Sequence, residues 1–425
     1  MSTTIDMESQ GLRIRNSQGV PEPLSILSNG ASGISQEPHP AGKVKHGGFV
    51  QILRMLLFAD CLIYCAVCIH VTQIIGSPLY FFNKDYYYAY MALTKQSFGL
   101  LITTLTQRFS PTLIHVSGDA SMQGQLMQTS DGRLETTFPE RLIMIANHQL
   151  YTDWLYLWWI AYTGRMHGHI YIILKEALKY VPVIGPAMMF YGFVFMARKW
   201  QSDMPRLRHR LEKLKGRHSG PLSGLQTLDP MWLLIFPEGT NLSANTRKGS
   251  KAWAAKQAVP DMQHQLLPRS TGLYFCLQQL RGSIDWLYDC TVAYEGVPKG
   301  GYAQDYFTLR STFFQGRPPK SVNMYWRRFP IASIPLDNAT EFEKWLKQRW
   351  EEKDQLLEYF KESGRFPADG AATATAEKTK GYIDTEVRLV KWYEAGQIFV
   401  VLATVALVVN VITKFSQVIL LPLSK

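Results

Sequence analysis

The sequence predicts an α/β fold with a mixed, mostly buried sheet flanked by helices, an N-terminal membrane helix or hairpin and a C-terminal membrane helix. Two observations support this class. Through the middle of the chain, short apolar runs alternate with segments long enough for helices, the pattern of a covered sheet. On either side of that region lies a long apolar run without charged residues. The 425 residues, of which 46% are hydrophobic, suffice for one sizeable domain with membrane segments or for two small domains.

The first 48 residues are polar and rich in Gly, Pro and Ser, and they show no hydrophobic period. Such a composition cannot bury enough apolar surface to fold, so we expect a disordered tail over residues 1–48. We recognise no cleavable signal peptide in it, because it lacks the apolar core segment that such a peptide requires.

The first long apolar run extends from Cys61 to Phe82 and contains no Asp, Glu, Lys or Arg. Its apolar character begins upstream, near Met55. At about 1.5 Å per helical residue, this run can cross a hydrocarbon core of roughly 30 Å. The next stretch, Tyr86 to Leu105, carries Lys95 among aromatic residues and leucines. We expect it to lie at the membrane interface or to form the second half of a membrane hairpin.

A second span is expected from Ala395 to Thr413, where the chain is again free of charge. Basic residues precede the first apolar run, so the positive-inside rule places that end in the cytoplasm. A single N-terminal span then puts the middle of the chain in a lumen, whereas a hairpin puts it in the cytoplasm. The alternative for these runs is buried core helices, in which Arg54 and Asp60 would need partners.

Five short runs that are apolar on both faces predict buried strands at residues 142–145, 170–174, 193–196, 232–236 and 291–294. From Thr340 to Ser363, interleaved charges predict a helix that opens with the capping-box spacing of Thr340 and Glu343. The Ala-, Thr- and Gly-rich segment that follows indicates a linker. The predicted organisation is a tail (1–48), a membrane segment or hairpin (49–108), the α/β domain (109–366), a linker (367–394) and a C-terminal transmembrane segment (395–425).

The net charge of +11 indicates anionic partners, for which nucleic acid, an anionic membrane surface and a phosphorylated substrate are candidates. The most basic run, Arg206 to His218, lacks interleaved aromatic residues, which disfavours nucleic acid. The five cysteines are odd in number and irregularly spaced, which disfavours a disulfide framework. Cys61, Cys65 and Cys68 share a helical face within an apolar run, so we expect them to face lipid or helices rather than a metal.

One strand end carries the first candidate for chemistry. The predicted strand runs into Asn147-His148-Gln149-Leu150-Tyr151-Thr152-Asp153, and the junction of a strand end and a helix start is a usual catalytic position in α/β sheets. On one ideal helix, His148 and Asp153 would point about 140° apart, so contact requires His148 in the turn and Asp153 in the first turns of the helix. A histidine held by a carboxylate is a general base. For this pair alone, the alternative is a capped helix with a surface histidine.

A second motif, Phe236-Pro237-Glu238-Gly239-Thr240, ends another predicted strand with a tight turn. Glu238 could hold a cation or accept a hydrogen bond from a substrate hydroxyl, and Thr240 could donate to a phosphate or a carbonyl. A purely structural turn is the alternative. The sequence contains neither Gly-x-Ser-x-Gly nor Gly-x4-Gly-Lys-Ser/Thr, which disfavours hydrolases and nucleoside triphosphatases of those classes.

In combination, the two motifs resemble those of the glycerolipid acyltransferase family, which acylates glycerol phosphate, lysophosphatidate and lysophospholipids. Two further blocks are similar to the family pattern, namely Tyr191–Trp200 and Leu267–Gly272, and the run 289–294 also fits. The resemblance spans about residues 50–335. It is strongest with the lysocardiolipin and lysophosphatidylinositol branch, in which a leucine follows the Glu-Gly-Thr turn at the position of Leu242.

The resemblance implies an acyl-CoA-dependent O-acyltransferase that needs no metal or other cofactor and acylates the free, sn-2 hydroxyl of a lysophospholipid. It implies catalytic roles for His148 and Asp153. Substrate-binding roles are expected for Asn147, Lys175, Arg198, Lys199, Phe236, Pro237, Glu238, Gly239, Thr240, Pro268 and Arg269. The expected partners are acyl-CoA, the lysophospholipid and a membrane, at the endoplasmic reticulum, with the catalytic domain on the cytoplasmic side.

Two positions depart from the family pattern. Many lysophosphatidate acyltransferases carry an arginine directly after Glu-Gly-Thr, where this chain has Asn241. Asparagine cannot clamp a phosphate monoester as a guanidinium does, which shifts the expected acceptor toward a phosphodiester lipid, although Arg247, Lys248 and Lys251 could compensate. Apolar residues, Met196 and Ala197, precede Arg198 where the family often has polar ones.

In the expected mechanism, His148 removes the proton of the acceptor hydroxyl and Asp153 orients and stabilises His148. The hydroxyl then attacks the thioester directly, without a Cys or Ser nucleophile. One rival is an enzyme of the same fold with another acceptor. A second is a catalytically silent membrane protein that binds lipids or acts as a scaffold, which the joint presence of His148, Asp153 and Glu238 disfavours. The third is a nucleic-acid binder.

Overall fold

The computed structural model describes residues 39–219, 226–369, 373–374 and 381–420. Most of the predicted tail, residues 1–38, lies outside these ranges. Within them, eight strands form one sheet in the order β13-β1-β11-β10-β4-β9-β5-β6. The bounds are β1 (Leu113–Gly118), β4 (Arg141–Ala146), β5 (Ile170–Lys175), β6 (Val194–Met196), β9 (Met231–Ile235), β10 (Trp286–Tyr294), β11 (Ser321–Pro330) and β13 (Ile383–Glu386).

The strand predictions are confirmed as elements of this sheet, in which β4, β5, β6, β9 and β10 each contain most of one predicted run. These five strands run parallel to one another, while β11 is antiparallel to β10, so the sheet is mixed as expected. A small three-stranded sheet consists of β12 (Thr373–Ala374), β2 (Leu126–Gln128) and β3 (Leu134–Thr136). A two-stranded sheet pairs β7 (Arg217–Ser219) with β8 (Gln226–Leu228).

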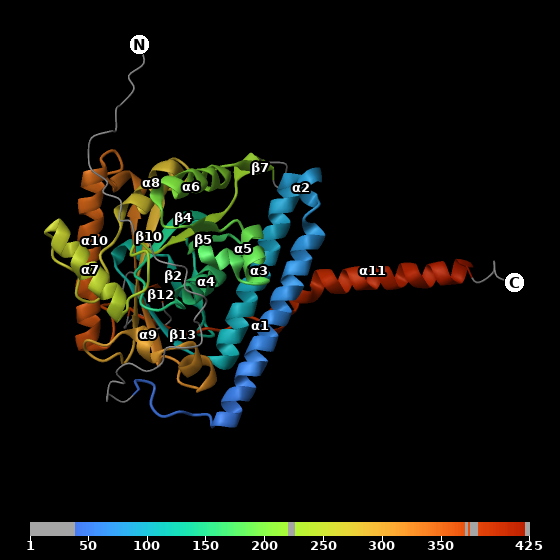
Figure 1. The fold of residues 1–425 in the computed structure, drawn as a ribbon, viewed down its shortest axis with the longest axis horizontal. Helices are drawn as coiled ribbons and strands as arrows, with labels where there is room; N and C mark the ends of the chain where they lie inside the picture. The colour runs from blue at the N-terminus through green and yellow to red at the C-terminus, as the bar shows by residue number, and fades with distance from the viewer. Residues whose placement is uncertain (1–38, 220–225, 370–372, 375–380, 421–425) are drawn as a thin grey trace, which may run out of the picture. The chain divides into compact units, whose positions relative to one another are not determined.

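Helices cover both faces of the large sheet (Figure 1). Along β4, Leu142 and Met144 pack into one apolar core with residues of α3 and α4, whereas Ile143 and Ile145 pack into another with residues of α6, α8 and α10. This alternation buries both faces of the strand, which explains its uninterrupted apolar sequence. The helices are α1 (Gly48–Gly76), α2 (Leu79–Phe82), α3 (Lys84–Phe109), α4 (Asp153–Thr163), α5 (Ile184–Phe190), α6 (Trp200–Leu214), α7 (Ala244–Gln257), α8 (Ser270–Leu280), α9 (Ala303–Tyr306), α10 (Ala339–Ser363) and α11 (Gln397–Leu420).

The N-terminal apolar segment forms a helical hairpin in which α1 packs along α3 (Figure 1). Asn83 begins α3 by accepting hydrogen bonds from the amides of Asp85 and Tyr86. Most of α1 is exposed, whereas α3 is buried along much of its length and also contacts α4. Lys95 is only 2% exposed and its ammonium lies over the Tyr171 ring. The stretch at 86–105 therefore packs against the α/β fold, which explains its mixed composition.

Two helical segments are long and apolar enough to cross a membrane, Gly48–Phe82 and Trp392–Gln417. Most of their surface is exposed, unlike that of a core helix, so they indicate membrane association. The alternative of buried core helices is thereby disfavoured. Arg54 nevertheless finds polar partners, because its guanidinium donates to the carbonyls of Phe109 and Phe313.

Two local predictions are corrected by the structure. The long helix α10 is capped at its N-terminus by Asn338, whose side chain accepts hydrogen bonds from the amides of Thr340 and Glu341, so Thr340 is not the cap. Part of the segment predicted as a linker, 367–394, forms β13 and pairs with β1. The reason is a period of two, because Ile383 and Thr385 are buried while their neighbours are exposed.

Candidate active site

The carboxyl ends of the parallel strands β4, β9, β5 and β6 lie at one edge of the sheet, and the residues that follow them are the sequence-predicted ones. His148 lies in the turn after β4, and Asp153 is the first residue of α4. Nδ1 of His148 lies 2.8 Å from Oδ2 of Asp153. The two side chains are therefore in contact, with His148 in the turn and Asp153 in the first turn of the helix, as expected from the sequence.

Asp153 is held by donors on both of its oxygens. Oδ2 accepts hydrogen bonds from the amides of Gln149 and Leu150, at 2.7 and 2.9 Å, and Oδ1 accepts one from the hydroxyl of Tyr294. The carboxylate is fully buried. Because an ionised carboxylate only accepts, Nδ1 of His148 must carry the proton that it shares with Oδ2. This fixes the tautomer and leaves Nε2 as the unprotonated nitrogen.

His148 is also fixed by its surroundings. Its ring stacks on that of Phe236, with centroids 4.2 Å apart and planes 22° from parallel. Its carbonyl accepts from the amide of Leu242 at 2.8 Å. The side chain is 17% exposed, and Nε2 makes no hydrogen bond within the part of the chain that the structure describes. A single ring nitrogen thus faces a partly open site.

The side chain of Glu238 links its own turn to two other segments, the His148 turn and the segment at Leu266. Oε1 accepts from the amide of His148 at 2.9 Å, and Oε2 accepts from the amide of Leu266 at 3.2 Å. The residue is only 2% exposed, and this burial raises the pKa of its carboxyl to about 8. Its oxygens therefore face backbone amides of the protein rather than an open site.

The raised pKa of Glu238 predicts a pH-dependent contribution to stability. Because the unfolded chain releases this proton at lower pH than the folded protein, the contribution is complete below the ordinary pKa of 4.5 and is lost as the pH rises through about 8. In Glu238→Gln the side chain cannot ionise. The free energies of unfolding of the wild type and of this variant are measured in detergent at pH values between 5 and 8. The wild-type value minus the variant value should be lower at pH 8 than at pH 5 by a few kcal/mol, since one pKa unit corresponds to about 1.4 kcal/mol. A difference that is constant with pH would contradict this.

Two arginines converge on the turn that contains Glu238. Gly239 takes a φ of 73°, which a side chain would strain, and its carbonyl accepts from the guanidinium of Arg198 at 2.9 Å. The amide of Arg269 donates to the carbonyl of Pro237 at 2.8 Å. Burial lowers the pKa of Arg198, and the charge of Arg269 lowers it further. Two guanidinium groups of like charge in this position form a candidate anion site.

The other expected binding residues are distributed around this edge. Lys175 ends β5 and is exposed, and Lys199 precedes α6 with its amide bound to Asp203. Thr240 and Pro268 are partly exposed. Asn147 is different, because it is fully buried and its side-chain amide exchanges hydrogen bonds with the backbone of Val292 at 2.9 and 2.7 Å. Its contacts tie β4 to β10 rather than leaving it free for a ligand.

Asn241, which stands directly after Glu-Gly-Thr where many family members have an arginine, forms a neutral pair with Gln304. Nδ2 of Asn241 donates to Oε1 of Gln304 at 2.5 Å. Arg247 does not compensate, because it is buried and its guanidinium donates to the carbonyls of Met262 and Gln265. The expectation that Arg247 replaces the missing charge is therefore wrong for this residue. A guanidinium has five N–H donors, so one arginine can bind several backbone carbonyls of a loop at once.

Tyr294 is a site residue that the sequence motifs did not single out. It ends β10, the neighbour of β4, and its hydroxyl binds Asp153. Only the pairing of β10 with β4 brings the two together, and that pairing joins segments far apart in the chain. In the sequence, Tyr294 belongs to the run 289–294, which is similar to the family pattern but does not indicate a role for any one of its residues.

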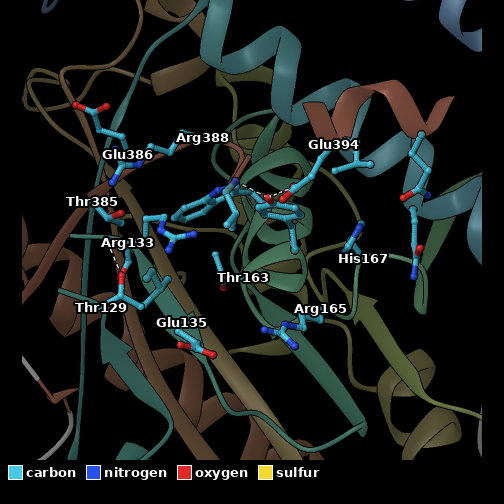
Figure 2. Close-up of a pocket in the computed structure, with 17 residues that line it drawn as sticks. Thr129, Arg133, Glu135, Thr163, Arg165, His167, Thr385, Glu386, Arg388 and Glu394 are labelled. Carbon is cyan, nitrogen blue, oxygen red and sulfur yellow. Dashed lines mark hydrogen bonds between the residues drawn. The ribbon is translucent and has the colours of Figure 1, made fainter. Parts of the chain in front are cut away.

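A cavity of about 470 Å³ lies at the other end of α4 (Figure 2). Arg133, Arg165 and Arg388 line it together with Glu135, Glu386 and Glu394, and none of the residues expected to act in catalysis does. Arginines and glutamates balance one another there. We therefore do not place the active site in this cavity.

Comparison with known proteins defines the class to which this fold and site belong. A family model described as Acyltransferase matches residues 131–295, and one described as Acyltransferase C-terminus matches residues 312–390. The chain thus belongs to the acyltransferase family, in the class of the 1-acylglycerol-3-phosphate and lysophospholipid acyltransferases.

Among its relatives is an acyltransferase of Schizosaccharomyces pombe, 41% identical over 74% of this chain and 87% of that protein. The 2-acyl-1-lysophosphatidylinositol acyltransferase of Saccharomyces cerevisiae is 34% identical over 77% of this chain and 88% of its own length. The lysocardiolipin acyltransferase 1 of Gallus gallus is 33% identical over 53% of this chain and 55% of its own length. The family recognised from the motifs is therefore confirmed. The Saccharomyces cerevisiae and Gallus gallus relatives are named for different acceptors, lysophosphatidylinositol and lysocardiolipin.

Proposed function

We propose that this acyltransferase transfers a fatty acyl group from acyl-CoA to the free sn-2 hydroxyl of a lysophospholipid. The observation that carries the proposal is the pair of His148 and Asp153 at the sheet edge, in which Nδ1 is bound to the carboxylate and Nε2 is left as a base. Direct attack of an alcohol on a thioester requires such a base and a positioned donor, and neither a metal nor a protein nucleophile.

In the proposed reaction, Nε2 of His148 takes the proton of the acceptor hydroxyl as its oxygen forms a bond to the thioester carbon. The buried carboxylate of Asp153 stabilises the imidazolium that results. The carbon–sulfur bond then breaks, and the imidazolium returns its proton to the leaving sulfur, so CoA departs as a thiol. The products are the diacyl lipid and CoA, and His148 is regenerated.

The arginines at the Pro237–Thr240 turn supply phosphate contacts in this proposal. Arg198 and Arg269 approach that turn from the end of β6 and the start of α8, and the turn also supports His148 through Glu238. A phosphate bound there would be held close to the base. Lys175 and Lys199 lie on the same edge and would extend the positive potential.

Replacing Arg269 tests this assignment. We expect Arg269→Ala to raise the KM for one substrate by at least about tenfold, because a charge-assisted hydrogen bond contributes roughly 1.5–3 kcal/mol. Arg281→Ala is the matched control, since Arg281 follows the other end of the same helix and pairs with Asp337. Separate titrations of acyl-CoA and lysophospholipid would identify the substrate. Equal KM values in Arg269→Ala and the control would contradict the assignment.

We further propose that the enzyme works at the endoplasmic reticulum with its catalytic domain on the cytoplasmic side. The hairpin of α1 and α3 supports this, because it returns the chain to the side on which it begins. At its tip, Phe81 and Phe82 are 86% and 85% exposed, as expected of side chains that enter lipid. Acyl-CoA is present on the cytoplasmic side.

The acceptor is proposed to be a lysophospholipid, with lysophosphatidylinositol, lysocardiolipin and lysophosphatidate as candidates. Of these, the phosphodiesters lysophosphatidylinositol and lysocardiolipin are favoured over lysophosphatidate, which is a monoester. The neutral pair of Asn241 and Gln304 supports a diester over a monoester, because a monoester carries more charge. The deciding experiment incubates the purified protein with labelled acyl-CoA and a panel of lysophospholipids and identifies the products by mass spectrometry. Failure to acylate any lysophospholipid would refute the proposal.

A further inference from the structure

A cavity of about 530 Å³ adjoins the catalytic pair on the side of β10. Three of the residues that line it bind the pair directly or support its backbone. The amide of Gln149 and the hydroxyl of Tyr294 donate to Asp153, and the amide of Leu242 donates to the carbonyl of His148. The cavity therefore shares its wall with the candidate active site.

Three lysines from separate parts of the chain line this cavity. Lys251 comes from α7, Lys299 from the loop after β10, and Lys361 from the end of α10. We name the space the lysine cavity. Among the residues with described positions, none of the three ammonium groups has a carboxylate within ion-pair distance or an acceptor at hydrogen-bond distance. Their positive charges are thus available to a ligand.

The acidic groups of the lysine cavity, in contrast, have partners. Asp261 accepts from the guanidinium of Arg247 and from the hydroxyl of Ser250. Glu295 accepts from the hydroxyl of Ser321. Neither carboxylate contacts a lysine of the cavity, and the lining has four cationic side chains, Arg247 and the three lysines, against these two carboxylates, so the cavity carries a net positive charge.

Lys361 lies close enough to Arg247 and Lys299 for their charges to act on it. Burial lowers the pKa of Lys361 most, and the charges of Arg247 and Lys299 lower it further, against the opposite effect of Glu358 and Asp354. Gathering like charges around a partly buried space costs free energy, which an anion in that space would offset. The neutral polar side chains of Gln149, Gln263 and Tyr302 in the same wall provide hydrogen-bonding partners for hydroxyl groups.

We propose that the lysine cavity binds a phosphate group of a substrate, as a second anion site separate from the one at Arg198 and Arg269. The proposal rests on the proposed function, in which both substrates carry phosphate. Ammonium groups act as point charges and do not need the bidentate geometry of a guanidinium clamp, so they can bind a diester as well as a monoester. The phosphate can belong to the headgroup of the acceptor lipid or to CoA, and the two sources are separated by experiment.

The kinetic test uses Lys251→Gln, Lys299→Gln and Lys361→Gln in one protein. Lys256→Gln is the matched control, because Lys256 is exposed on the same helix as Lys251 and does not line the cavity. We expect the triple variant to raise a KM at least tenfold, with a steeper effect at low salt. A raised KM for the lysophospholipid alone assigns the headgroup, and one for acyl-CoA alone assigns CoA. Unchanged KM values for both overturn the proposal.

A binding test separates this proposal from the proposed function. It uses His148→Ala in detergent, with and without the triple substitution, and calorimetric titration with CoA and with glycerophosphoinositol. Loss of binding of either probe in the triple variant, with binding retained in Lys256→Gln, supports the lysine cavity even if no lysophospholipid is acylated. Equal affinities for both probes with and without the triple substitution overturn it, whatever the activity.

Discussion

His148→Ala is expected to lower kcat for acyl transfer by about 10²- to 10⁴-fold, because it removes the base placed to take the acceptor proton. The fold should persist. The hydrogen bonds that hold the turn are made by the backbone amide and carbonyl of His148, to Glu238 and from Leu242, and survive the substitution. The measurement is steady-state acyl transfer from labelled acyl-CoA, with melting temperature as the test of folding.

The control for this variant is His209→Ala, which removes an exposed histidine of α6. It should leave kcat and melting temperature unchanged. If His148→Ala melts with the wild type and still turns over at a comparable rate, the base is another group, and the proposed mechanism fails.

Asp153→Asn is expected to lower kcat by about 10²-fold or more with little loss of folding. The amides of Gln149 and Leu150 both point at Oδ2, so the asparagine should place its carbonyl oxygen there and its NH₂ toward Tyr294. His148 then keeps its tautomer, but the negative charge that stabilises the imidazolium is lost. The rate loss therefore measures that electrostatic contribution.

The double variant His148→Ala/Asp153→Asn tests whether the two residues act as one unit. If Asp153 acts only through His148, the double variant should be no slower than His148→Ala, because grouped catalytic residues are strongly non-additive. Multiplicative losses would show that Asp153 has a separate role. Tyr294→Phe provides a milder comparison, since it removes one hydrogen bond from the carboxylate and keeps its charge.

The sequence predicted the architecture wherever a local pattern had a direct structural cause. Runs such as Leu142–Ile145 were apolar on both faces because helices bury both faces of β4, and they were predicted as strands. The long uncharged runs became α1 and α11. The failures were of two kinds. Asn338 was missed as the cap of α10 because capping depends on the backbone angles of one residue, and β13 was missed because an edge strand depends on its partner β1.

For the candidate site, the sequence by itself determined the identities of His148, Asp153 and Glu238, their order at strand ends and the family to which they belong. The tertiary structure decided what each side chain faces. It turned Asn147 and Glu238 toward the backbone, brought Tyr294 to Asp153, and gathered three distant lysines around one cavity. The physical reason is that these contacts join residues far apart in the chain. The pairing of β4 with β9 and with β10 and the packing of α7 and α10 bring them together.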